Sequence, residues 1–348
     1  MRKFLAIVSV WIIVLAAGAL VAQQTAAPAA GSSGPIPWAY GFPPGPAALA
    51  ATPAAAAPAA APAAAAPAAP DDSKKTLPGS SGSFTLAEIR NGFGPADWYP
   101  EDHPVMPEVV AKGRQKDVRA CSLCHYPNGK GRAENAGVSD LPVAYFIQQM
   151  QDFRNGVRNS AEPRKANTKT MATIAKAMTD EEIKQSAEYF AKIKWTPWIK
   201  VVEAKDVPKT RIAGGLFLKL EGNQTEPLGQ RIIEVPENTE RTEMFRDPRS
   251  GFVAYVPVGS LKKGEALVMN GASKTTACGI CHGADLKGLG PVPGIAGRSP
   301  SYLVRQMWDM KVGARNGLWA DLMKPVVAKL TEEDLLNIAA YTASRSGS

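Results

Sequence analysis

The sequence predicts a mainly α-helical protein of two homologous units in tandem, joined by a small β-rich connector. Three observations predict this fold. The pentapeptide Cys-x-x-Cys-His occurs twice, the residues around both copies are alike, and a stretch rich in β-branched and aromatic residues separates them. The 348 residues, 45% of them apolar, suffice for two small domains and their connections. We divide the chain into residues 1–22, 23–83, 84–200, 201–258 and 259–348.

Residues 1–22 are predicted to form a hydrophobic N-terminal helix, either a cleaved signal peptide or a membrane anchor. The chain starts Met1-Arg2-Lys3 and continues with an apolar run over residues 4–22. This run is close to the roughly 20 residues that span a bilayer. Ala17-Gly18-Ala19 offers a cleavage site, so both alternatives stay open. In either case the remaining chain is exported, and we expect a periplasmic protein, free or tethered to the inner membrane by residues 4–22.

Residues 23–83 are predicted to be a disordered, Ala/Pro-rich linker. Residues 47–70 are all Ala or Pro except Leu49 and Thr52, a composition that gives a semi-rigid spacer without a core. A spacer of this kind favours an anchored N-terminus, whereas a cleaved signal would leave it as a free tail. The island Ile36–Phe42 is too aromatic for a plain linker. It docks either onto a partner or onto the protein itself.

An internal repeat shows that the two units are homologous. At a constant offset of 157 residues, the motif and the residues after it align without a gap as far as Arg158-Asn159 and Arg315-Asn316. Each unit is predicted to contain an upstream helix, a helix carrying the motif, an amphipathic helix between two loops, and a final helix that starts at a threonine N-cap followed by acids. The upstream helices are expected near Met106–Arg114 and Lys263–Asn270, the amphipathic ones at Val143–Arg154 and Ser301–Lys311, and the caps at Thr179 and Thr331.

The connector, residues 201–258, is predicted to be a small β-hairpin or meander. Three runs, 216–218, 231–235 and 252–256, are rich in residues that favour strands and are separated by Gly, Pro and Asn. The connector contains no cysteine or histidine, and Met244 is the one residue in it that could serve as a soft metal ligand. We therefore expect a rigid spacer that fixes the distance between the two units.

The two pentapeptides have the attachment signature of c-type haem. They use all four cysteines and two of the three histidines in the chain. Two cysteines at this spacing form thioethers to one porphyrin, and the adjacent histidine binds the iron. A redox dithiol would need no histidine at that position, and two zinc sites of three ligands each would lack a fourth. We therefore expect two covalently bound haem c groups, held by Cys121, Cys124 and His125 and by Cys278, Cys281 and His282.

Methionine is the expected sixth ligand of each iron, because one spare histidine cannot serve two sites. The repeat pairs Met171 with Met323, each seven residues before the hydrophobic residue that precedes the helix cap. Met178 pairs with Leu330, which cannot bind iron, so Met178 is expected in the core.

Three other candidates are interpreted as structural. Met150 and Met307 also pair in the repeat, but they lie at helical spacing in amphipathic helices, where methionine usually packs. His103 is expected to be a surface or capping residue, with haem ligation as the alternative.

These motifs resemble those of diheme class I cytochromes c over about residues 105–200 and 260–345. The resemblance implies single-electron transfer, and a proline-containing loop whose carbonyl bonds the ligand histidine. Pro293 matches this position in the second unit and would orient His282. The first unit departs from the pattern with Ala136, so another carbonyl is expected there and the two potentials are expected to differ.

Arg158 and Arg315 occupy matched positions in the repeat. Their planar guanidinium groups make them candidate partners of the haem propionates. The alternative is that both are ordinary surface arginines.

The charge balance points to protein partners. The chain carries a formal charge of +8, of which +4 lies in residues 259–348. Four propionates would leave a modestly basic molecule, which suits a redox donor and acceptor with acidic docking surfaces. Nucleic acid is not expected, because the basic residues are interspersed with acids.

The leading hypothesis is an electron-transfer protein and not an enzyme. Histidine–methionine ligation saturates an iron, leaving no substrate site, so single electrons would pass between the two haems and on to periplasmic or membrane partners. One alternative is the cytochrome subunit of a larger dehydrogenase complex, with the connector and the island around Trp38 as docking surfaces. Another is a diheme peroxidase, which needs one haem with an open sixth position.

Overall fold

The computed structural model describes residues 36–43 and 71–345. The predicted helix at residues 1–22 and most of the predicted linker lie outside this part. Within it, no helix is both long and apolar enough to cross a membrane.

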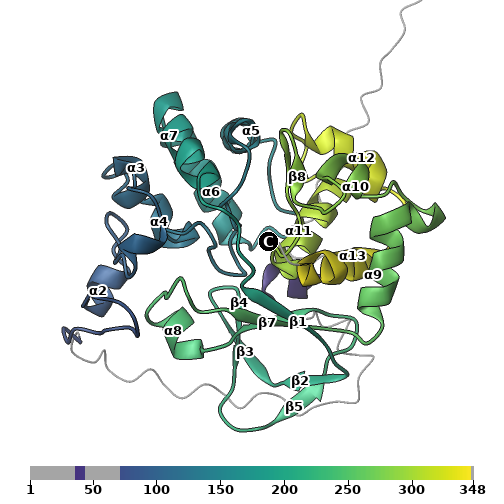
Figure 1. Cartoon of the computed structure of the whole chain (residues 1–348), viewed down its shortest axis with the longest axis horizontal. Helices are drawn as coiled ribbons and strands as arrows, with labels where there is room; N and C mark the ends of the chain where they lie inside the picture. Colours follow the sequence, from purple (N-terminus) through teal and green to yellow (C-terminus); the bar gives the residue numbers. More distant parts are fainter. Residues whose placement is uncertain (1–35, 44–70, 346–348) are drawn as a thin grey trace, which may run out of the picture. The chain divides into compact units, whose positions relative to one another are not determined.

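The first unit is helical, and its amphipathic helix has the predicted bounds (Figure 1). The upstream helix is shorter than predicted, because Pro107 precedes its first turn and Gly113, at φ +68°, ends it. The helices are α2 (Leu86–Ile89), η2 (Pro100–Asp102), α3 (Glu108–Ala111), α4 (Cys121–His125), α5 (Val143–Arg154), α6 (Ala166–Ala177) and α7 (Asp180–Ala191).

The second unit repeats the order of the helices from α3 to α7. Its upstream helix starts earlier than predicted, directly after Gly259. A two-stranded ribbon follows its motif. The elements are α9 (Ser260–Asn270), η3 (Gly271–Ser273), α10 (Gly279–His282), β8 (Gly288–Leu289), β9 (Val292–Pro293), α11 (Pro300–Lys311), α12 (Ala320–Val327) and α13 (Glu332–Ser344).

The final helices start as predicted, each with a capping box. The Thr179 hydroxyl accepts a hydrogen bond from the Glu182 N–H at 3.1 Å, and the Glu182 carboxylate accepts one from the Thr179 N–H at 2.7 Å. Thr331 and Asp334 make the same pair of bonds, at 3.2 and 2.9 Å. The repeat is thus preserved in structure at its helix starts.

Helices α6 and α12 are present where a loop was expected. In α6, Met171, Ile174 and Ala175 follow helical spacing and pack against the apolar core of the first unit. In α12, Met323 and Val327 do the same in the second unit, although Pro325 lies within the helix. The helical spacing of these apolar residues is the sequence signal for both helices.

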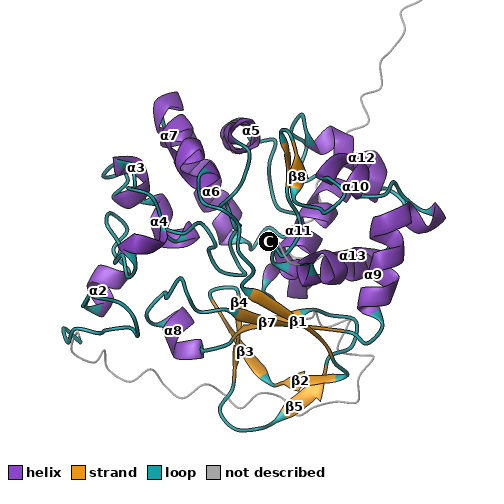
Figure 2. Ribbon diagram, in the orientation of Figure 1, coloured by secondary structure: helices purple, strands orange, loops and turns teal. Residues whose placement is uncertain are grey.

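The connector is β-rich as predicted, but it is not a simple meander (Figure 2). In its three-stranded sheet, β7 lies between β1, which runs parallel to it, and β6, which runs antiparallel. A parallel pair requires a crossover, so the chain must leave the sheet and return. The elements are β1 (Ile199–Glu203), β2 (Asp206–Pro208), β3 (Thr210–Ala213), β4 (Leu216–Lys219), β5 (Thr225–Pro227), β6 (Ile233–Pro236), α8 (Thr239–Glu243) and β7 (Phe252–Val256).

A true hairpin joins β3 and β4. Ala213 lies opposite Leu216, and the turn between them is Gly214-Gly215, with φ +58° and +86°. Positive φ at both positions is what the type I′ turn requires, one of the two-residue turns that join antiparallel strands.

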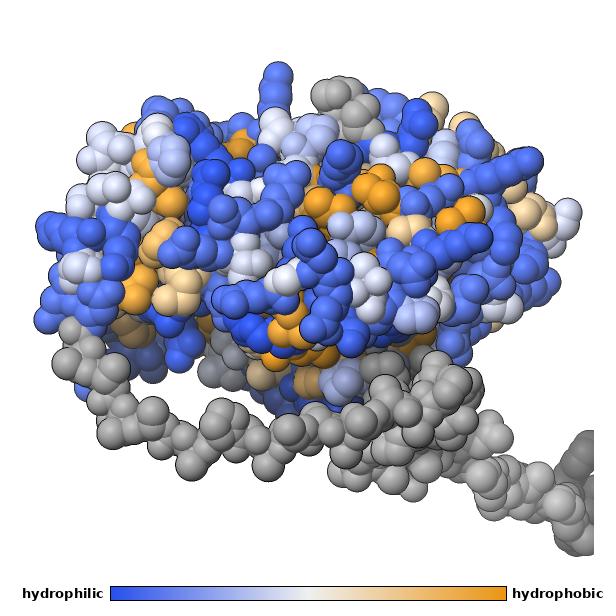
Figure 3. Space-filling view, turned by 90° about the horizontal axis from the view of Figure 1, so that it is seen from below, coloured by the Kyte–Doolittle hydropathy of each residue, from blue (hydrophilic) through white to orange (hydrophobic). Residues whose placement is uncertain are grey.

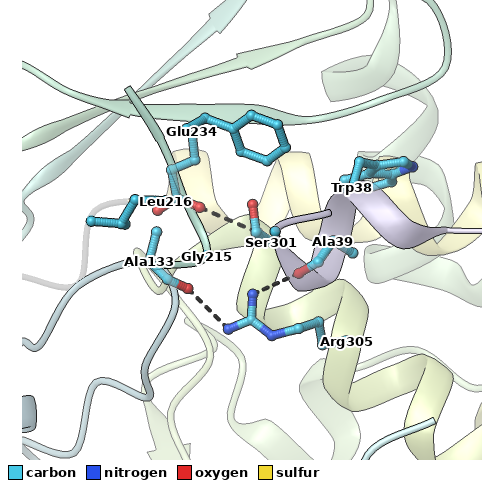
Figure 4. Close-up of a pocket in the computed structure, with 10 residues that line it drawn as sticks. Trp38, Ala39, Ala133, Gly215, Leu216, Glu234, Ser301 and Arg305 are labelled. Carbon is cyan, nitrogen blue, oxygen red and sulfur yellow. Dashed lines mark hydrogen bonds between the residues drawn. The ribbon is translucent and has the colours of Figure 1, made fainter. Parts of the chain in front are cut away.

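The island at Ile36–Phe42 docks onto this protein itself, which decides between the two alternatives. It forms one turn of 3-10 helix, η1 (Pro37–Tyr40), in which Trp38 and Tyr40 are only 5% and 3% exposed. The Tyr40 hydroxyl donates to the Asp309 carboxylate at 2.7 Å, and Arg305 donates to the Ala39 carbonyl at 2.7 Å (Figure 4). The island therefore packs against α11.

We expect Tyr40→Phe to destabilise the folded holoprotein by about 1–3 kcal/mol, because the buried Asp309 carboxylate loses a hydrogen bond. Chemical unfolding followed by far-UV circular dichroism measures the change. Tyr341→Phe is the matched control, since no hydrogen bond of the Tyr341 hydroxyl is found within the described residues. Equal midpoints for the two variants would contradict the role given to the island.

Helices α9 and α13 pack side by side at a glycine (Figure 1). A Cβ at Gly264 would collide with the backbone carbonyl of Asn337, which cannot move independently of α13. We expect Gly264→Ala to cost about 3 kcal/mol by forcing the helices apart. Thermal unfolding measures the effect, and Glu265→Ala, at the exposed neighbouring position, is the control. A wild-type unfolding midpoint for both Gly264→Ala and Glu265→Ala would rule out the close approach of the helices.

Candidate haem sites

The two motif helices, α4 and α10, hold their histidines in the same way. The His125 Nδ1 lies 2.9 Å from the Ala136 carbonyl oxygen, and the His282 Nδ1 lies 2.8 Å from the Pro293 carbonyl oxygen. The second contact has the geometry that the resemblance implies. The expectation of a different carbonyl in the first unit is wrong, because the backbone oxygen of Ala136 is available whether or not the residue is proline.

This contact fixes the chemical form of each imidazole. Burial lowers the pKa of both His125 and His282, so both rings are neutral at neutral pH. A neutral ring that donates from Nδ1 to a carbonyl carries its lone pair on Nε2. Nε2 is then the nitrogen that can bind a metal.

The four cysteines, all in the described part of the chain, form no disulfide with one another. Burial raises the pKa of Cys121 to about 11 and that of Cys278 to about 11, and it also raises the pKa of Cys124. A redox dithiol works through a thiolate of lowered pKa. These thiols lack that property, so the arrangement does not suit a thioredoxin-like site.

The methionines separate into two groups. Met171 on α6 and Met323 on α12 are partly buried, each against the apolar core next to its own motif. Met178 is 4% exposed and lies in the core, as its pairing with Leu330 predicted. Met150 and Met307 are also buried, on α5 and α11, and pack as expected.

His103 is the C-cap residue of η2, in agreement with the capping alternative, and it is not a fully exposed surface residue. Its side chain is 4% exposed, with Nε2 3.2 Å from the Asp97 carboxylate and Nδ1 2.9 Å from the Pro104 carbonyl. Both ring nitrogens therefore have protein partners. Asp97, six residues before His103, is the sequence signal for this pairing.

Arg158 and Arg315 meet where the two units join. Their backbones form an isolated antiparallel bridge, flanked by hydrogen bonds from Asn159 N–H to the Ala314 carbonyl at 2.9 Å and from Asn316 N–H to the Val157 carbonyl at 2.8 Å. Both arginines are buried. The alternative that they are ordinary surface residues is therefore wrong.

The side chains at this junction cross between the units in matched pairs. Arg158 donates to the Tyr302 hydroxyl and the Gln306 amide oxygen, both at 3.1 Å. Arg315 donates to the Tyr145 hydroxyl at 2.9 Å and to the Gln149 amide oxygen at 2.6 Å. In the repeat, Tyr145 is the counterpart of Tyr302 and Gln149 is the counterpart of Gln306. The junction thus has approximate two-fold symmetry built from the duplicated sequence.

Two further arginines at the junction escaped the sequence analysis. Arg298 donates to the Gly137 and Ser139 carbonyls of the first unit, at 2.9 and 3.1 Å, and its guanidinium stacks on Trp195. Arg305 donates to the Ala133 carbonyl at 2.9 Å (Figure 4). Neither has an arginine counterpart in the repeat, so the comparison of units gave no signal for them.

Four buried arginines gather at the junction, with the buried acids Glu234 and Asp309 near Arg305. Arg158, Arg298, Arg305 and Arg315 are all buried, and none forms an ion pair with an acid of the described residues. The Nε of Arg315 also has no hydrogen-bond partner there. Buried charges normally need compensation, and anionic carboxylates of a bound group would supply it.

Known proteins resemble the chain over as much as two thirds of its length. No family model matches it. The thiosulfate dehydrogenase electron acceptor of Stutzerimonas stutzeri (strain A1501) is 32% identical over 236 residues, which are 67% of this chain and 82% of that protein. The chain belongs to the diheme class I cytochromes c. As a member of that family, this cytochrome binds two haem c groups covalently.

Two other relatives match this cytochrome over single-unit lengths. Cytochrome c-554(548) of Halomonas halodenitrificans is 40% identical over 76 residues, 22% of this chain and 92% of that protein. Cytochrome c4 of Pseudomonas aeruginosa is 42% identical over 76 residues, 22% of this chain. That match spans only 36% of the length of cytochrome c4.

Proposed function

We propose that the two motifs are the haem attachment sites of this cytochrome. Cys121 and Cys124 would bind one haem and Cys278 and Cys281 the other, with His125 and His282 as iron ligands. The Nδ1 contacts, which leave the lone pair of each histidine on Nε2, and the absence of a disulfide among the four described cysteines support this assignment. When bound, each haem supplies a centre that accepts or releases one electron.

Met171 and Met323 are the sixth ligands in this proposal. They lie on equivalent helices, next to the apolar core beside their own motif, and they are only partly buried. Met150 and Met307, which also pair in the repeat, are instead fully packed within the cores. Pro293 and Ala136 would set the orientation of the histidines through their carbonyls.

The buried arginines at the junction are proposed to compensate haem propionates. Arg158 and Arg315 are the primary candidates, and Arg298 and Arg305 add further positive charge. Their lack of acidic partners among the described residues is the observation behind this proposal. Propionates held at one shared junction would bring the two haems close enough for electrons to pass between the units.

We propose that the protein functions as an electron carrier and not as an enzyme. The observation that carries this proposal is the matched placement of Met171 and Met323, each against the apolar core that also includes a cysteine of its own motif. A spectroelectrochemical titration of the holoprotein should show two reversible one-electron steps with low-spin haem throughout. A high-spin haem that turns over hydrogen peroxide would indicate the peroxidase alternative instead.

A dehydrogenase is the proposed electron donor. Two relatives are named thiosulfate dehydrogenase electron acceptor, and one of them is 32% identical over two thirds of this chain. We expect a thiosulfate dehydrogenase supplied with thiosulfate to reduce both haems of the purified holoprotein. Size-exclusion chromatography of the mixture distinguishes a mobile carrier, which elutes alone, from a fixed subunit, which co-elutes.

An exported location is part of the proposal. The basic start and apolar run of residues 1–22 would direct the chain to the periplasm, where haem c is attached. Residues 4–22, which lie outside the described residues, would either remain as an inner-membrane tether or be removed with a cleaved signal peptide. Mass spectrometry of the mature N-terminus tests it.

A further inference from the structure

A segment of the connector covers the first motif and brings a positive charge to it. We define this cover as Thr239–Ser250, which comprises α8 and the loop after it. Arg246 donates from Nη1 to the Leu123 carbonyl, inside the motif, at 2.8 Å. Asn128 donates to the Pro248 carbonyl at 3.0 Å. The backbone of Arg246 has φ +50°, a left-handed conformation that is uncommon outside glycine. The fold therefore places this arginine at the motif by several contacts at once.

Residues before the first motif hold the cover on its other side. The Trp98 indole N–H donates to the Phe245 carbonyl at 2.8 Å. Arg249 stacks on Tyr99, with 3.6 Å between its guanidinium carbon and the ring centroid, and forms an ion pair with Asp102. Arg249 is exposed, so its charge faces solvent. The cover is thus a fixed part of the fold with one basic side chain at the motif and another on its outer side.

A pair of opposite charges lies beside the same motif. Arg132 and Glu134 form an ion pair at 2.5 Å, with side chains only 13% and 2% exposed. Arg132 also reaches the Thr242 carbonyl of the cover, at 3.5 Å. The Glu134 Oε2 and the Arg246 Nε are buried and have no hydrogen-bond partner among the described residues. Buried charges are screened less than charges on the surface.

These three charges act on a cysteine that would carry the first haem. Burial has the largest effect on the pKa of the Cys124 thiol and raises it. Of the charged groups, Arg246 has the next effect and lowers this pKa, Glu134 raises it, and Arg132 lowers it. The three side chains therefore lie within electrostatic range of the Cys124 sulfur, where charges of opposite sign act in opposite directions. A haem attached at that sulfur would experience the same field.

The second motif lacks this arrangement within the described residues. At the repeat offset of 157, the counterpart of Arg132 is Leu289 and that of Glu134 is Pro291, both uncharged and exposed. Ile280, at the third position of the second motif, is itself 68% exposed. The charges beside the first motif are thus particular to the first unit and the connector, and duplication does not account for them.

Charges on the outside of the molecule are less able to act on a redox centre. The face seen in Figure 3 is mostly hydrophilic, with apolar residues in small patches, so polar and charged side chains predominate there. Water and salt screen such charges over about 8 Å at physiological ionic strength. The buried charges beside the first motif are therefore the ones that we expect to matter.

We propose that Arg246 and Glu134 set the reduction potential of the first haem in opposite directions, Arg246 raising it and Glu134 lowering it. The proposal rests on the proposed carrier function. Reduction adds one electron to the haem and transfers no proton or bond, so a fixed positive charge nearby favours the reduced form and a fixed negative charge favours the oxidised form. The connector is then more than a spacer, because it influences how an electron is shared between the two haems.

Redox titration of the holoprotein followed by proton NMR tests this, because resonances near Leu123 report the first haem and those near Ile280 the second. Arg246→Gln removes the charge and keeps an N–H that can donate to Leu123. We expect the ratio of reduced to oxidised first haem at a fixed potential to fall about tenfold, which is about 59 mV for one electron. Glu134→Gln keeps an oxygen that can accept from Arg132 and should raise the same ratio several-fold. The ratio for the second haem should be unchanged in both variants.

Two further variants separate charge from packing. Arg246→Lys keeps the positive charge but not the planar fork, so it should recover most of the wild-type ratio for the first haem. Arg249→Gln removes a charge from the exposed side of the same cover and should leave both haems as in the wild-type protein. A cover that acted only through packing would instead give Arg246→Lys and Arg246→Gln the same shift.

The outcomes separate this proposal from the carrier function. An unchanged first haem in both Arg246→Gln and Glu134→Gln, or shifts of the same sign in the two, would overturn the proposal. If Arg246→Gln does not fold, an unchanged or lowered ratio in Glu134→Gln overturns it alone. Two reversible low-spin steps with unmoved potentials leave the carrier function standing, whereas an irreversible titration of the wild-type protein refutes the function and the proposal together.

Discussion

Replacing either proposed methionine ligand should change one haem and leave the other as it was. In Met323→Ala the iron of the second haem should lose its methionine ligand and become high-spin or water-ligated in the ferric state, while the cysteine attachment is kept. Its reduction potential should fall by on the order of 0.1 V, a fraction of the roughly 0.8 V that axial ligands span, because the thioether stabilises ferrous iron. Met171→Ala should do the same at the first haem. Optical redox titration measures both effects.

The paired methionines on the neighbouring helices provide matched controls. Met307→Leu and Met150→Leu keep an apolar side chain of similar volume in the core, so we expect stability changes below about 1.5 kcal/mol and unchanged spectra. If Met307→Leu abolished low-spin character while Met323→Ala did not, the assignment of the ligand would be wrong.

Removing the charge of Arg315 should weaken the junction between the units. Arg315→Met keeps much of the volume but loses the hydrogen bonds to Tyr145, Gln149 and Gln306. We expect the free energy of unfolding of the holoprotein to fall by about 3 kcal/mol. The buried oxygens of Tyr145, Gln149 and Gln306, and the haem propionate proposed to pair with Arg315, would lose a hydrogen-bond donor. At least one reduction potential should fall by tens of millivolts, because a cation near a haem favours the reduced state.

The conservative variant separates charge from packing. Arg315→Lys retains the cation but not the planar fork, so it should recover most of the potential and only part of the stability. Arg158→Met should reproduce the effects of Arg315→Met, since the two residues are matched across the junction. A stable Arg315→Met protein with wild-type potentials would refute the propionate role of this residue.

The repeat explains which parts of the fold were predictable. Helix α5 and the caps at Thr179 and Thr331 follow from local signals, namely apolar spacing and a threonine followed by acids. The parallel pairing of β1 with β7 does not, because it depends on contacts between strands far apart in the sequence. Helix α12 was missed because Pro325 lies within it, although tertiary packing tolerates the proline there.

The candidate sites were predictable to the extent that chemistry and duplication mark them. The motif residues and the pairing of Met171 with Met323 are visible in the sequence. Arg298 and Arg305 were not, because each acts across the junction and neither is duplicated. The cover over Leu123 was equally hidden, since nothing in residues 239–250 signals the motif against which they fold.

The most direct test of a carrier with two saturated haems is the near-infrared spectrum of the fully oxidised holoprotein at neutral pH. We expect methionine–iron charge-transfer intensity equivalent to two haems per chain, with no high-spin band, and half that intensity in either Met171→Ala or Met323→Ala. Intensity for one haem or none in the wild-type protein, or an unchanged band in both variants, would contradict the account.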